Sequence, residues 1–236
     1  MNDLRLQLNG RPLSISVRRL MIAGFTGRNS GSVREHIREL ERHGIPSPPS
    51  VPAFYHLDPH LLSTAKSFEV NSAAISGEAE ATLVFPDDQL DNALVGVGSD
   101  LTDRMLERKS IERAKLLPKP LGAQVWRLRD VRDCWDELQL TSWVAPGPAR
   151  RCYQKGTLSA LLRPEEIIER LPPEIRGDLA NTVLFLGTIP LCDAQFVFSD
   201  YFACELVDPG RGSLRCEYVL RNAPTFCRPT PSDVTR

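Results

Sequence analysis

The strongest constraint on the fold of this chain is how often its hydrophobic runs are interrupted. Nineteen prolines and 15 glycines are spread over 236 residues, and between them lie short apolar runs of the length and composition typical of strands. These runs are LMIAGF, EATLVF, ALVGVG, AQVWRLR, TVLFLGTI, AQFVFS, YFACELV and LRCEYVL. We therefore predict a mainly β fold (α+β) with a few short helices packed against it.

Three segments have the spacing of helices instead. Residues 32–35 match the S-x-x-E capping box, and Gly44 can close the helix that follows. A second helix is predicted over about residues 102–115, and a third over about residues 158–171. Because strand-like runs outnumber these segments, we expect the helices to flank the sheets.

The two ends of the chain differ from its middle. Residues 1–20 alternate polar and apolar positions around an Asn9-Gly10 turn, which predicts a β-hairpin-like segment. Residues 223–236 are predicted to form a loosely held tail. Residues 21–222 are left as the main domain.

Charge and hydropathy argue against some classes of function. The formal net charge is −1, so no overall field favours nucleic acid or an anionic membrane. No apolar run approaches the roughly 20 residues of a membrane span, and the N-terminal sequence lacks the apolar core of a signal peptide. The six cysteines are scattered without a CxxC pair, which is typical of reduced thiols. We expect a cytoplasmic protein that binds neither nucleic acid nor membranes.

The stretch SGEAEATLVF combines a strand pattern with two acids. Because side chains alternate across a strand, Glu78 and Glu80 share one face with Thr82 and Val84. Two carboxylates side by side repel each other, and glutamate is disfavoured in strands. Either this face is exposed to water, or positive charge lies against it.

Asp100 is a third acid with two interpretations. It follows the strand-like run ALVGVG, where Ser99 or Asp100 could simply cap a helix. It could equally lie near Glu78 and Glu80 in the same sheet. Three carboxylates together would suit a hard cation such as Mg²⁺, Mn²⁺ or Ca²⁺.

Two further pairs of residues could take part in chemistry. His36 and Glu39 are three residues apart and share a helix face, where they could polarise a water molecule or form an ordinary surface pair. Lys115 and Lys119 could anchor a carboxylate or stabilise an enolate, although most lysines only cover surface.

The order of these segments resembles the fumarylacetoacetate hydrolase superfamily over about residues 21–222. An E-x-E or H-x-x-E motif alone is trivial, but eight elements in the right order are not. The matching segments are Gly27-Arg28-Asn29, His36-x-x-Glu39, Pro52-Ala53-Phe54-Tyr55, Glu78-Ala79-Glu80, Asp100-Leu101-Thr102-Asp103-Arg104, Lys115 with Pro120-Leu121-Gly122, Thr157 with Ser159, and Gly177-Asp178 with VLFLGTIP.

The resemblance implies a mixed β-sandwich roll that forms a homodimer and binds one Mg²⁺ or Mn²⁺ through Glu78, Glu80 and Asp100. It implies that His36 and Glu39 order and deprotonate a water molecule. It also implies a set of residues near the substrate. These are Lys115 at the substrate's oxygens, and Arg28, Tyr55, Arg104, Gln154 and Thr188 on the substrate side.

The sequence departs from the family's pattern in several places. Three extra residues separate Asn29 from His36, and His56 stands where the family has a lysine. The interval before Pro120 is shortened, which leaves open whether Lys115 or Lys119 takes the lysine's role. Leu186 also replaces a threonine in the last motif, so we expect a divergent branch of the family.

The resemblance favours a metal-dependent hydrolase that cleaves a carbon–carbon bond of an acylpyruvate-like or 1,3-dicarbonyl acid through a metal-stabilised enolate. The pair His36–Glu39 would activate the water. The alternative is a metal-dependent decarboxylase, tautomerase or dehydratase of a 2-oxo acid, since enolate chemistry serves all of these. A further alternative is a non-catalytic binding protein that retains the fold.

Overall fold

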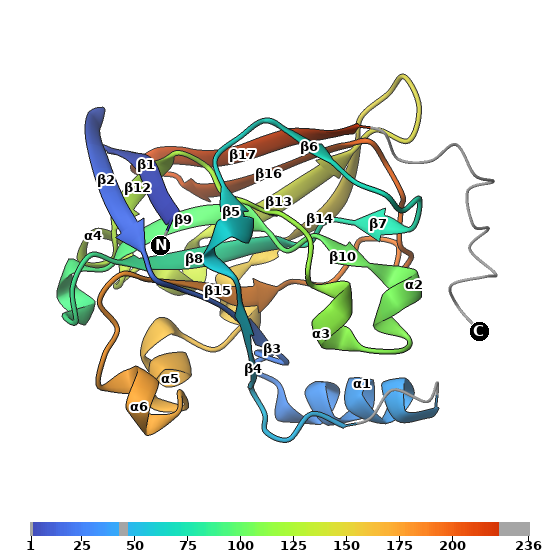
Figure 1. The fold of residues 1–236 in the computed structure, drawn as a ribbon, viewed down its shortest axis with the longest axis horizontal. Helices are drawn as coiled ribbons and strands as arrows, with labels where there is room; N and C mark the ends of the chain where they lie inside the picture. The colour runs from blue at the N-terminus through green and yellow to red at the C-terminus, as the bar shows by residue number, and fades with distance from the viewer. Residues whose placement is uncertain (1, 43–46, 222–236) are drawn as a thin grey trace.

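The computed structural model describes residues 2–42 and 47–221, so the predicted tail at residues 223–236 lies outside the described chain. Its largest element is a curled, mixed eight-stranded sheet with the order β2-β1-β12-β9-β8-β15-β3-β4 (Figure 1). The strands are β1 (Asn2–Leu8), β2 (Arg11–Val17), β3 (Arg19–Gly24), β4 (Ala53–Leu57), β8 (Ala79–Phe85), β9 (Leu94–Ser99), β12 (Gln124–Arg127) and β15 (Thr182–Thr188).

A five-stranded sheet with the order β14-β13-β16-β17-β6 packs against the first. Its strands are β6 (Ser67–Glu69), β13 (Gln139–Val144), β14 (Arg151–Thr157), β16 (Tyr201–Asp208) and β17 (Gly212–Arg221). Two short ladders complete the β structure, namely β7 (Ile75–Ser76) with β10 (Thr102–Asp103) and β5 (Leu62–Ser63) with β11 (Lys119–Pro120). The predicted fold class, mainly β with short flanking helices, is confirmed.

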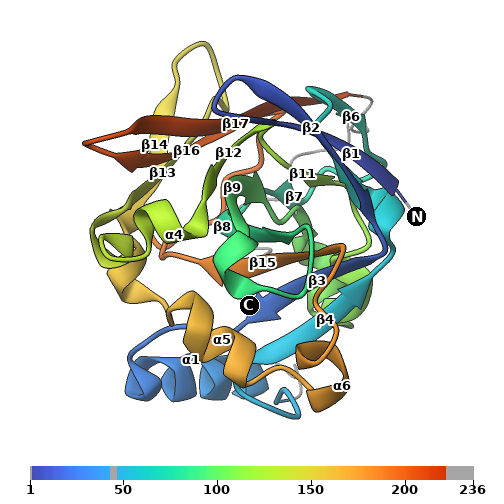
Figure 2. The same ribbon diagram turned by 90° about the vertical axis from the view of Figure 1, so that its left-hand side faces the viewer.

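Two apolar cores lie on opposite faces of the large sheet. The first fills the space between the two sheets and takes Ala79, Ala81, Leu83 and Phe85 from β8. The second lies inside the curl of the large sheet, which Figure 2 shows from the side, and takes Val84 from the same strand. β8 therefore alternates as predicted, but all of its residues are buried. Neither face of this strand is exposed to water.

The N-terminal hairpin forms one end of the large sheet. β1 and β2 pair antiparallel and join at Asn9 and Gly10, whose φ angles of 51° and 75° suit a tight hairpin turn. β1 also pairs in parallel with β12, so the hairpin is continuous with the rest of the sheet.

The helices are short and lie outside the sheets. α1, α5 and α6 lie together on one side of the molecule (Figures 1 and 2). α2 and α3 lie side by side at the end of the sheets (Figure 1). The helices are α1 (Ser30–Arg42), α2 (Arg104–Glu107), α3 (Ile111–Ala114), α4 (Leu128–Val131), α5 (Pro164–Glu169) and α6 (Pro173–Arg176), with 3-10 turns η1 (Pro59–Leu61), η2 (Leu90–Asn92), η3 (Trp135–Glu137) and η4 (Leu158–Ala160). None of the helices in the described part of the chain is long and apolar enough to cross a bilayer.

The structure corrects the predicted helix bounds. α1 begins earlier than the capping box at 32–35 suggested, because Asn29 Oδ1 accepts hydrogen bonds from the backbone N–H groups of Gly31 and Ser32 at 2.9 and 3.1 Å. The predicted helix over 102–115 is wrong, since this segment contains β10 and the two separate helices α2 and α3. The predicted helix over 158–171 shortens to η4 and α5, because Pro164 can only start a helix.

One predicted strand is absent. The run AQFVFS at residues 194–199 has no strand structure and forms part of an irregular segment between β15 and β16. Its alternating apolar pattern suits a strand, but its first residue, Ala194, has a left-handed φ of 50°. The local pattern could not show that this segment packs on the core without pairing with either sheet.

Gly122 joins the two sheets by a close backbone approach. A Cβ atom at this position would lie 2.5 Å from the carbonyl oxygen of Arg215 in β17. We predict that Gly122→Ala lowers the free energy of unfolding by about 1–3 kcal/mol, because a backbone neighbour cannot move aside cheaply. Gly147→Ala is the control, since nothing lies within 4 Å of its Cβ position. Urea unfolding of both variants tests this, and equal midpoints would contradict it.

Candidate metal centre

The register of two neighbouring strands brings the three predicted carboxylates to one place. β8 and β9 pair antiparallel, with Ala79 opposite Ser99 and Glu80 opposite Gly98. The pairing continues one step beyond both strands, where Glu78 and Asp100 exchange two backbone hydrogen bonds of 3.1 and 2.9 Å. Residues opposite each other in such a pair project their side chains to the same face. Asp100 therefore joins Glu78 and Glu80 on one face.

The three acids form a compact, largely buried cluster. One oxygen of each of Glu78, Glu80 and Asp100 lies within 4.8 Å of the others, the only group of three or more potential metal ligands found among the described residues. Glu80 and Asp100 are 2% and 0% exposed. The capping interpretation of Asp100 is wrong, because the side chain of Asp103 caps α2 by accepting the N–H groups of Met105 and Leu106.

Two buried lysines neutralise Asp100 in different ways. Lys119 Nζ donates to the carbonyl oxygens of Leu101 and Leu117, each at 2.9 Å, so the backbone uses two of its three protons, and it forms an ion pair with Asp100 Oδ1 at 3.2 Å. Lys115 follows α3 and donates a short hydrogen bond to Asp100 Oδ2. Its ammonium lies 5.7 Å from the centroid of the Tyr55 ring on β4. Lys115 is thus the lysine with protons left for a ligand.

The electrostatics of the cluster follow from burial and these contacts. Burial, followed by the charge of Asp100, raises the pKa of Glu80 well above its ordinary value. Burial would also raise the pKa of Asp100, but Lys115 and Lys119 more than offset it and the pKa lies below its ordinary value. Burial would lower the pKa of Lys115, but Asp100 and Glu78 raise it overall. Burial, together with the positive charge of Lys115, lowers the pKa of Lys119 to about 8, although Asp100 acts to raise it.

Arg104 compensates the negative charge of Glu78. Its guanidinium lies 3.0 Å from Glu78 Oε1, donates 2.9 and 3.0 Å hydrogen bonds to Glu107, and donates from Nε to Ser76 Oγ at 2.6 Å. The ring of Phe196 covers the guanidinium at 4.1 Å. Only 3% of Arg104 is exposed, and its guanidinium is used by protein groups. These contacts are those of a residue that positions Glu78.

A hydrogen-bonded brace fixes the strand between the two glutamates. Gln154 Oε1 accepts the N–H of Ala79 at 2.9 Å, while Nε2 donates to Thr188 Oγ1 and Ile189 O at 2.7 Å each. Thr188 Oγ1 in turn donates to the carbonyl of Ala79 at 2.8 Å. The N–H of Gly187 donates to Glu80 Oε2 at 2.8 Å. Both amide protons of Gln154 are therefore used inside the protein.

The remaining predicted site residues lie elsewhere. His36 and Glu39 form the expected pair at 3.6 Å, but their side chains are 61% and 54% exposed. The rings of His36 and Phe25 lie 6.2 Å apart. Arg28 forms a two-pronged ion pair with Asp136 at 2.7 and 3.1 Å. In the described chain, none of these three residues forms a hydrogen bond or ion pair with the carboxylates.

Sequence reasoning missed two residues that hold the site. Glu107 pairs with Arg104, and the i,i+3 spacing of the two could have indicated it. Phe196 lies in the segment interpreted as a strand, and no local signal places its ring over a guanidinium.

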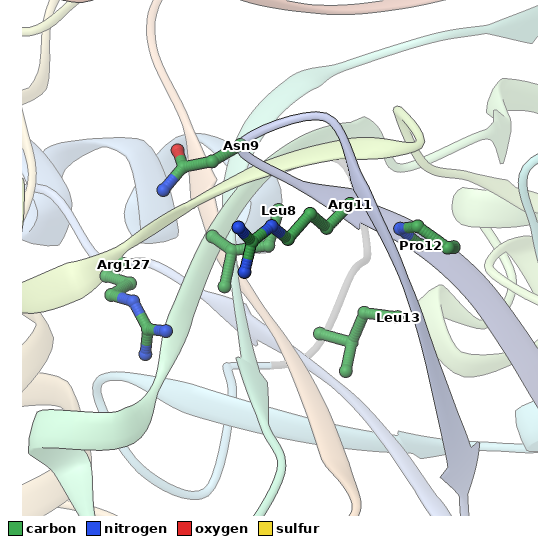
Figure 3. A pocket seen from close by; sticks show the side chains of 6 residues that line it. All are labelled: Leu8, Asn9, Arg11, Pro12, Leu13 and Arg127. Atoms are coloured by element: carbon green, nitrogen blue, oxygen red, sulfur yellow. The ribbon is translucent and has the colours of Figure 1, made fainter.

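A cavity lies at the other end of β9. It has a volume of about 370 Å³ and contains no acid, histidine or cysteine (Figure 3). Its lining residues are Leu8, Asn9, Arg11, Pro12, Leu13 and Arg127. Arg127 pairs with Leu94, six residues before Asp100, so roughly 20 Å of strand separates this cavity from the carboxylates. It does not belong to the candidate metal centre.

The acid cluster fits a hard divalent cation. Its donors are carboxylate oxygens, as Mg²⁺ and Mn²⁺ prefer. Glu80 uses one oxygen for the N–H of Gly187 and keeps the other. Asp100 Oδ1 is buried without a hydrogen-bond partner, although the Lys119 ammonium lies beside it. An oxygen left unpaired in the interior costs free energy that a cation would offset.

Several solved structures share this fold. A protein assigned to the fumarylacetoacetate hydrolase family from Yersinia pestis aligns with a TM-score of 0.63, 15% identity and 92% and 99% coverage of this chain and that chain. A Pseudomonas aeruginosa fumarylpyruvate hydrolase in complex with Mn²⁺ and pyruvate aligns with a TM-score of 0.62 and 15% identity, and the alignment covers 94% of this chain and 97% of that chain. A Mycobacterium marinum 2-hydroxyhepta-2,4-diene-1,7-dioate isomerase aligns with a TM-score of 0.59 and 17% identity, and the alignment covers 91% of this chain and 82% of that chain.

The fold is therefore that of the fumarylacetoacetate hydrolase superfamily, as the sequence motifs predicted. No curated protein sequence matches the chain. The model of a family described as a protein of unknown function (DUF2848) matches residues 23–218, so the chain belongs to this family. This agrees with the predicted divergent branch.

We predict that Gln154→Met lowers the free energy of unfolding by about 2 kcal/mol or more, because the buried partners of the amide lose their hydrogen bonds. Gln139→Met on the neighbouring strand β13 is the control, since Gln139 is exposed. Chemical unfolding of the two variants measures the difference. A loss no larger than that of Gln139→Met would show that the brace contributes nothing.

Arg28 offers a test by pH. Its hydrogen bonds, together with Arg163, lower the pKa of Asp136 from 3.8 to about 2. Because the folded value lies below the unfolded one, this stabilisation is present above about pH 4 and is lost as the pH falls through about 2.

We therefore predict that Arg28→Met raises the pKa of Asp136 towards 3.8 and destabilises the protein above about pH 4 but not near pH 2. NMR titration of the Asp136 carboxyl measures the shift, with Arg211→Met as the control that leaves Asp136 untouched. An unchanged pKa of Asp136 in Arg28→Met would contradict this pairing and favour the predicted substrate-binding role of Arg28.

Proposed function

We propose that this protein is a divalent-metal-dependent enzyme that cleaves a carbon–carbon bond of an acylpyruvate-like or 1,3-dicarbonyl acid by hydrolysis. The observation that carries the proposal is the buried cluster of Glu78, Glu80 and Asp100 with the Lys115 ammonium beside it. The fumarylpyruvate hydrolase that shares the fold was solved with Mn²⁺ and pyruvate, a 2-oxo acid.

Glu78, Glu80 and Asp100 would hold the cation, either Mg²⁺ or Mn²⁺. When bound, the cation would chelate two oxygens of the substrate and stabilise the negative charge of an enolate leaving group. Lys115 would donate its free N–H groups to a substrate oxygen, beside the ring of Tyr55. Lys119 would keep Asp100 in place, because two backbone carbonyls fix its ammonium and its charge lies 3.2 Å from Asp100 Oδ1.

The outer part of the site would come from α1. Hydrolysis needs a base for water, and the pair His36–Glu39 is the candidate. α1 begins at Ser30, close in the chain to Thr26, whose hydroxyl lies against Gly187. The helix is thus connected by a short segment to Thr26, which lies against the residue whose N–H binds Glu80.

A second candidate function is a reaction that needs no activated water, such as decarboxylation, tautomerisation or dehydration of a 2-oxo acid. The exposure of His36 and Glu39, and their lack of contact with the acid cluster in the described chain, favour it. For either reaction we propose a small-molecule acid as the substrate, a homodimer as the assembly and the cytoplasm as the location.

The metal proposal is tested first, by thermal unfolding with and without Mn²⁺ and oxalate, a mimic of a chelating enolate. A ligand at 100 times its dissociation constant stabilises the native state by about 2.7 kcal/mol. We expect a clear upward shift of the unfolding midpoint in the wild type and in Glu69→Gln, an exposed acid on β6, but not in Glu80→Gln. No shift in any protein would contradict a metal site and favour the non-catalytic alternative.

The reaction is tested by comparing hydrolysis of acetylpyruvate with decarboxylation of oxaloacetate in the presence of Mn²⁺. If His36 and Glu39 activate water, His36→Ala should lower the rate of hydrolysis by about 100-fold or more, with Mn²⁺ affinity unchanged. Arg38→Ala, at an exposed position on the same helix, should leave the rate intact. Decarboxylation that persists undiminished in His36→Ala, without hydrolysis in the wild type, would favour the second candidate.

A further inference from the structure

Two cysteines that are far apart in the sequence meet beside the brace of the metal centre. Cys152 lies on β14, and Cys192 lies in the irregular segment after β15. Their sulfur atoms are 3.8 Å apart, and both residues are exposed. The backbone holds the pair together, because the N–H of Cys192 donates to the carbonyl of Tyr153 at 2.9 Å and Gln154 forms a bridge with Leu191.

The chain contains a second thiol pair that serves as a comparison. Cys204 and Cys216 lie directly opposite each other on β16 and β17. Both are buried, at 0% and 4% exposure, so solutes cannot reach them in the folded protein. Of the two pairs in the described chain, the one beside the brace is the one open to an oxidant.

We propose that Cys152 and Cys192 are a thiol-modification site, at which a hydroperoxide forms a reversible disulfide within one chain. One thiolate attacks the peroxide oxygen, which gives a sulfenic acid and releases water when the oxidant is hydrogen peroxide. The second thiol attacks that sulfur, so that the S–S bond forms and a second water leaves. Two thiols are oxidised, the peroxide is reduced, and a reducing thiol reverses the reaction.

The new bond would act on the metal centre through the brace. The sulfur atoms have to approach from 3.8 Å to about 2.05 Å, which draws the segment after Ile189 towards β14. Gln154 is two residues from Cys152 and binds Ile189 and Thr188, so it lies inside the closed ring. Its Oε1 holds Ala79 between Glu78 and Glu80. Oxidation would therefore shift the strand that carries both glutamates.

The disulfide itself is tested on the full chain, reduced and then treated with hydrogen peroxide at about pH 8, because partial burial and the Cys192 thiol raise the pKa of Cys152. The remaining thiols are blocked with N-ethylmaleimide and mapped by peptide mass spectrometry. We expect a Cys152–Cys192 cross-link in the wild type and in Cys134→Ser, no cross-link in Cys152→Ser, and reduced Cys204 and Cys216 throughout. Recovery of both thiols as maleimide adducts, or a cross-link between chains on a non-reducing gel, would overturn the proposal.

The coupling to the metal centre rests on the proposed function and has a separate readout. Mn²⁺ affinity is measured by thermal shift before oxidation, after oxidation and after re-reduction. We expect oxidation to weaken Mn²⁺ binding about threefold or more in the wild type, reversibly, and not in Cys152→Ser. Equal affinities in the oxidised and reduced wild type would overturn the coupling. Failure of the reduced protein to bind Mn²⁺ would overturn the proposed function while the mapped disulfide stands.

Discussion

The pairing of three buried cations with Asp100 and Glu78, two members of a three-acid cluster, determines how this protein is built around its site. Glu78, Glu80 and Asp100 would be prohibitively costly to bury as bare charges. Lys115, Lys119 and Arg104 lie against them, and all three come from the segment between β9 and β12. A single helix over residues 102–115 would set Arg104 and Lys115 roughly 16 Å apart along its axis. The chain instead breaks after α2 and restarts at Ser110, which caps α3. Both cations then reach one cluster.

Small residues make room for this arrangement. A Cβ atom on Gly98 would lie 2.7 Å from the carbonyl oxygen of Pro120. Because glycine has no Cβ atom, β11 can lie close to Gly98, and this places Lys119 beside Asp100. Gly187 has a φ of 91° and turns its N–H to Glu80. The Thr26 hydroxyl fills the space where a side chain at Gly187 would be. The site therefore depends on close backbone approach as much as on charge.

The two halves of the proposed enzyme differ in how firmly they are held. The acid cluster lies on paired strands between two apolar cores and is braced by Gln154. His36 and Glu39 lie on α1, largely exposed and outside the sheets. Under the proposed function, the rigid half would hold the metal and the chelating acid. The outer half would deliver the water, and this step would separate hydrolysis from the other reactions of an enolate.

The sequence by itself determined the strands, the alternation along β8 and the order of motifs that indicates the superfamily, because these depend on local spacing. It also indicated the three carboxylates, since Glu78 and Glu80 share a strand face whatever the fold. The tertiary structure decided what opposes them. Contacts between segments distant in the chain decide whether Asp100 caps a helix and which lysine keeps protons for a ligand. Such contacts also pair Arg28 with Asp136. Contacts between distant segments also explain why the predicted helix is split at Ser110 and why residues 194–199 form no strand. There, burial of charge and backbone packing outweigh local propensity, and no single-segment pattern carries that information.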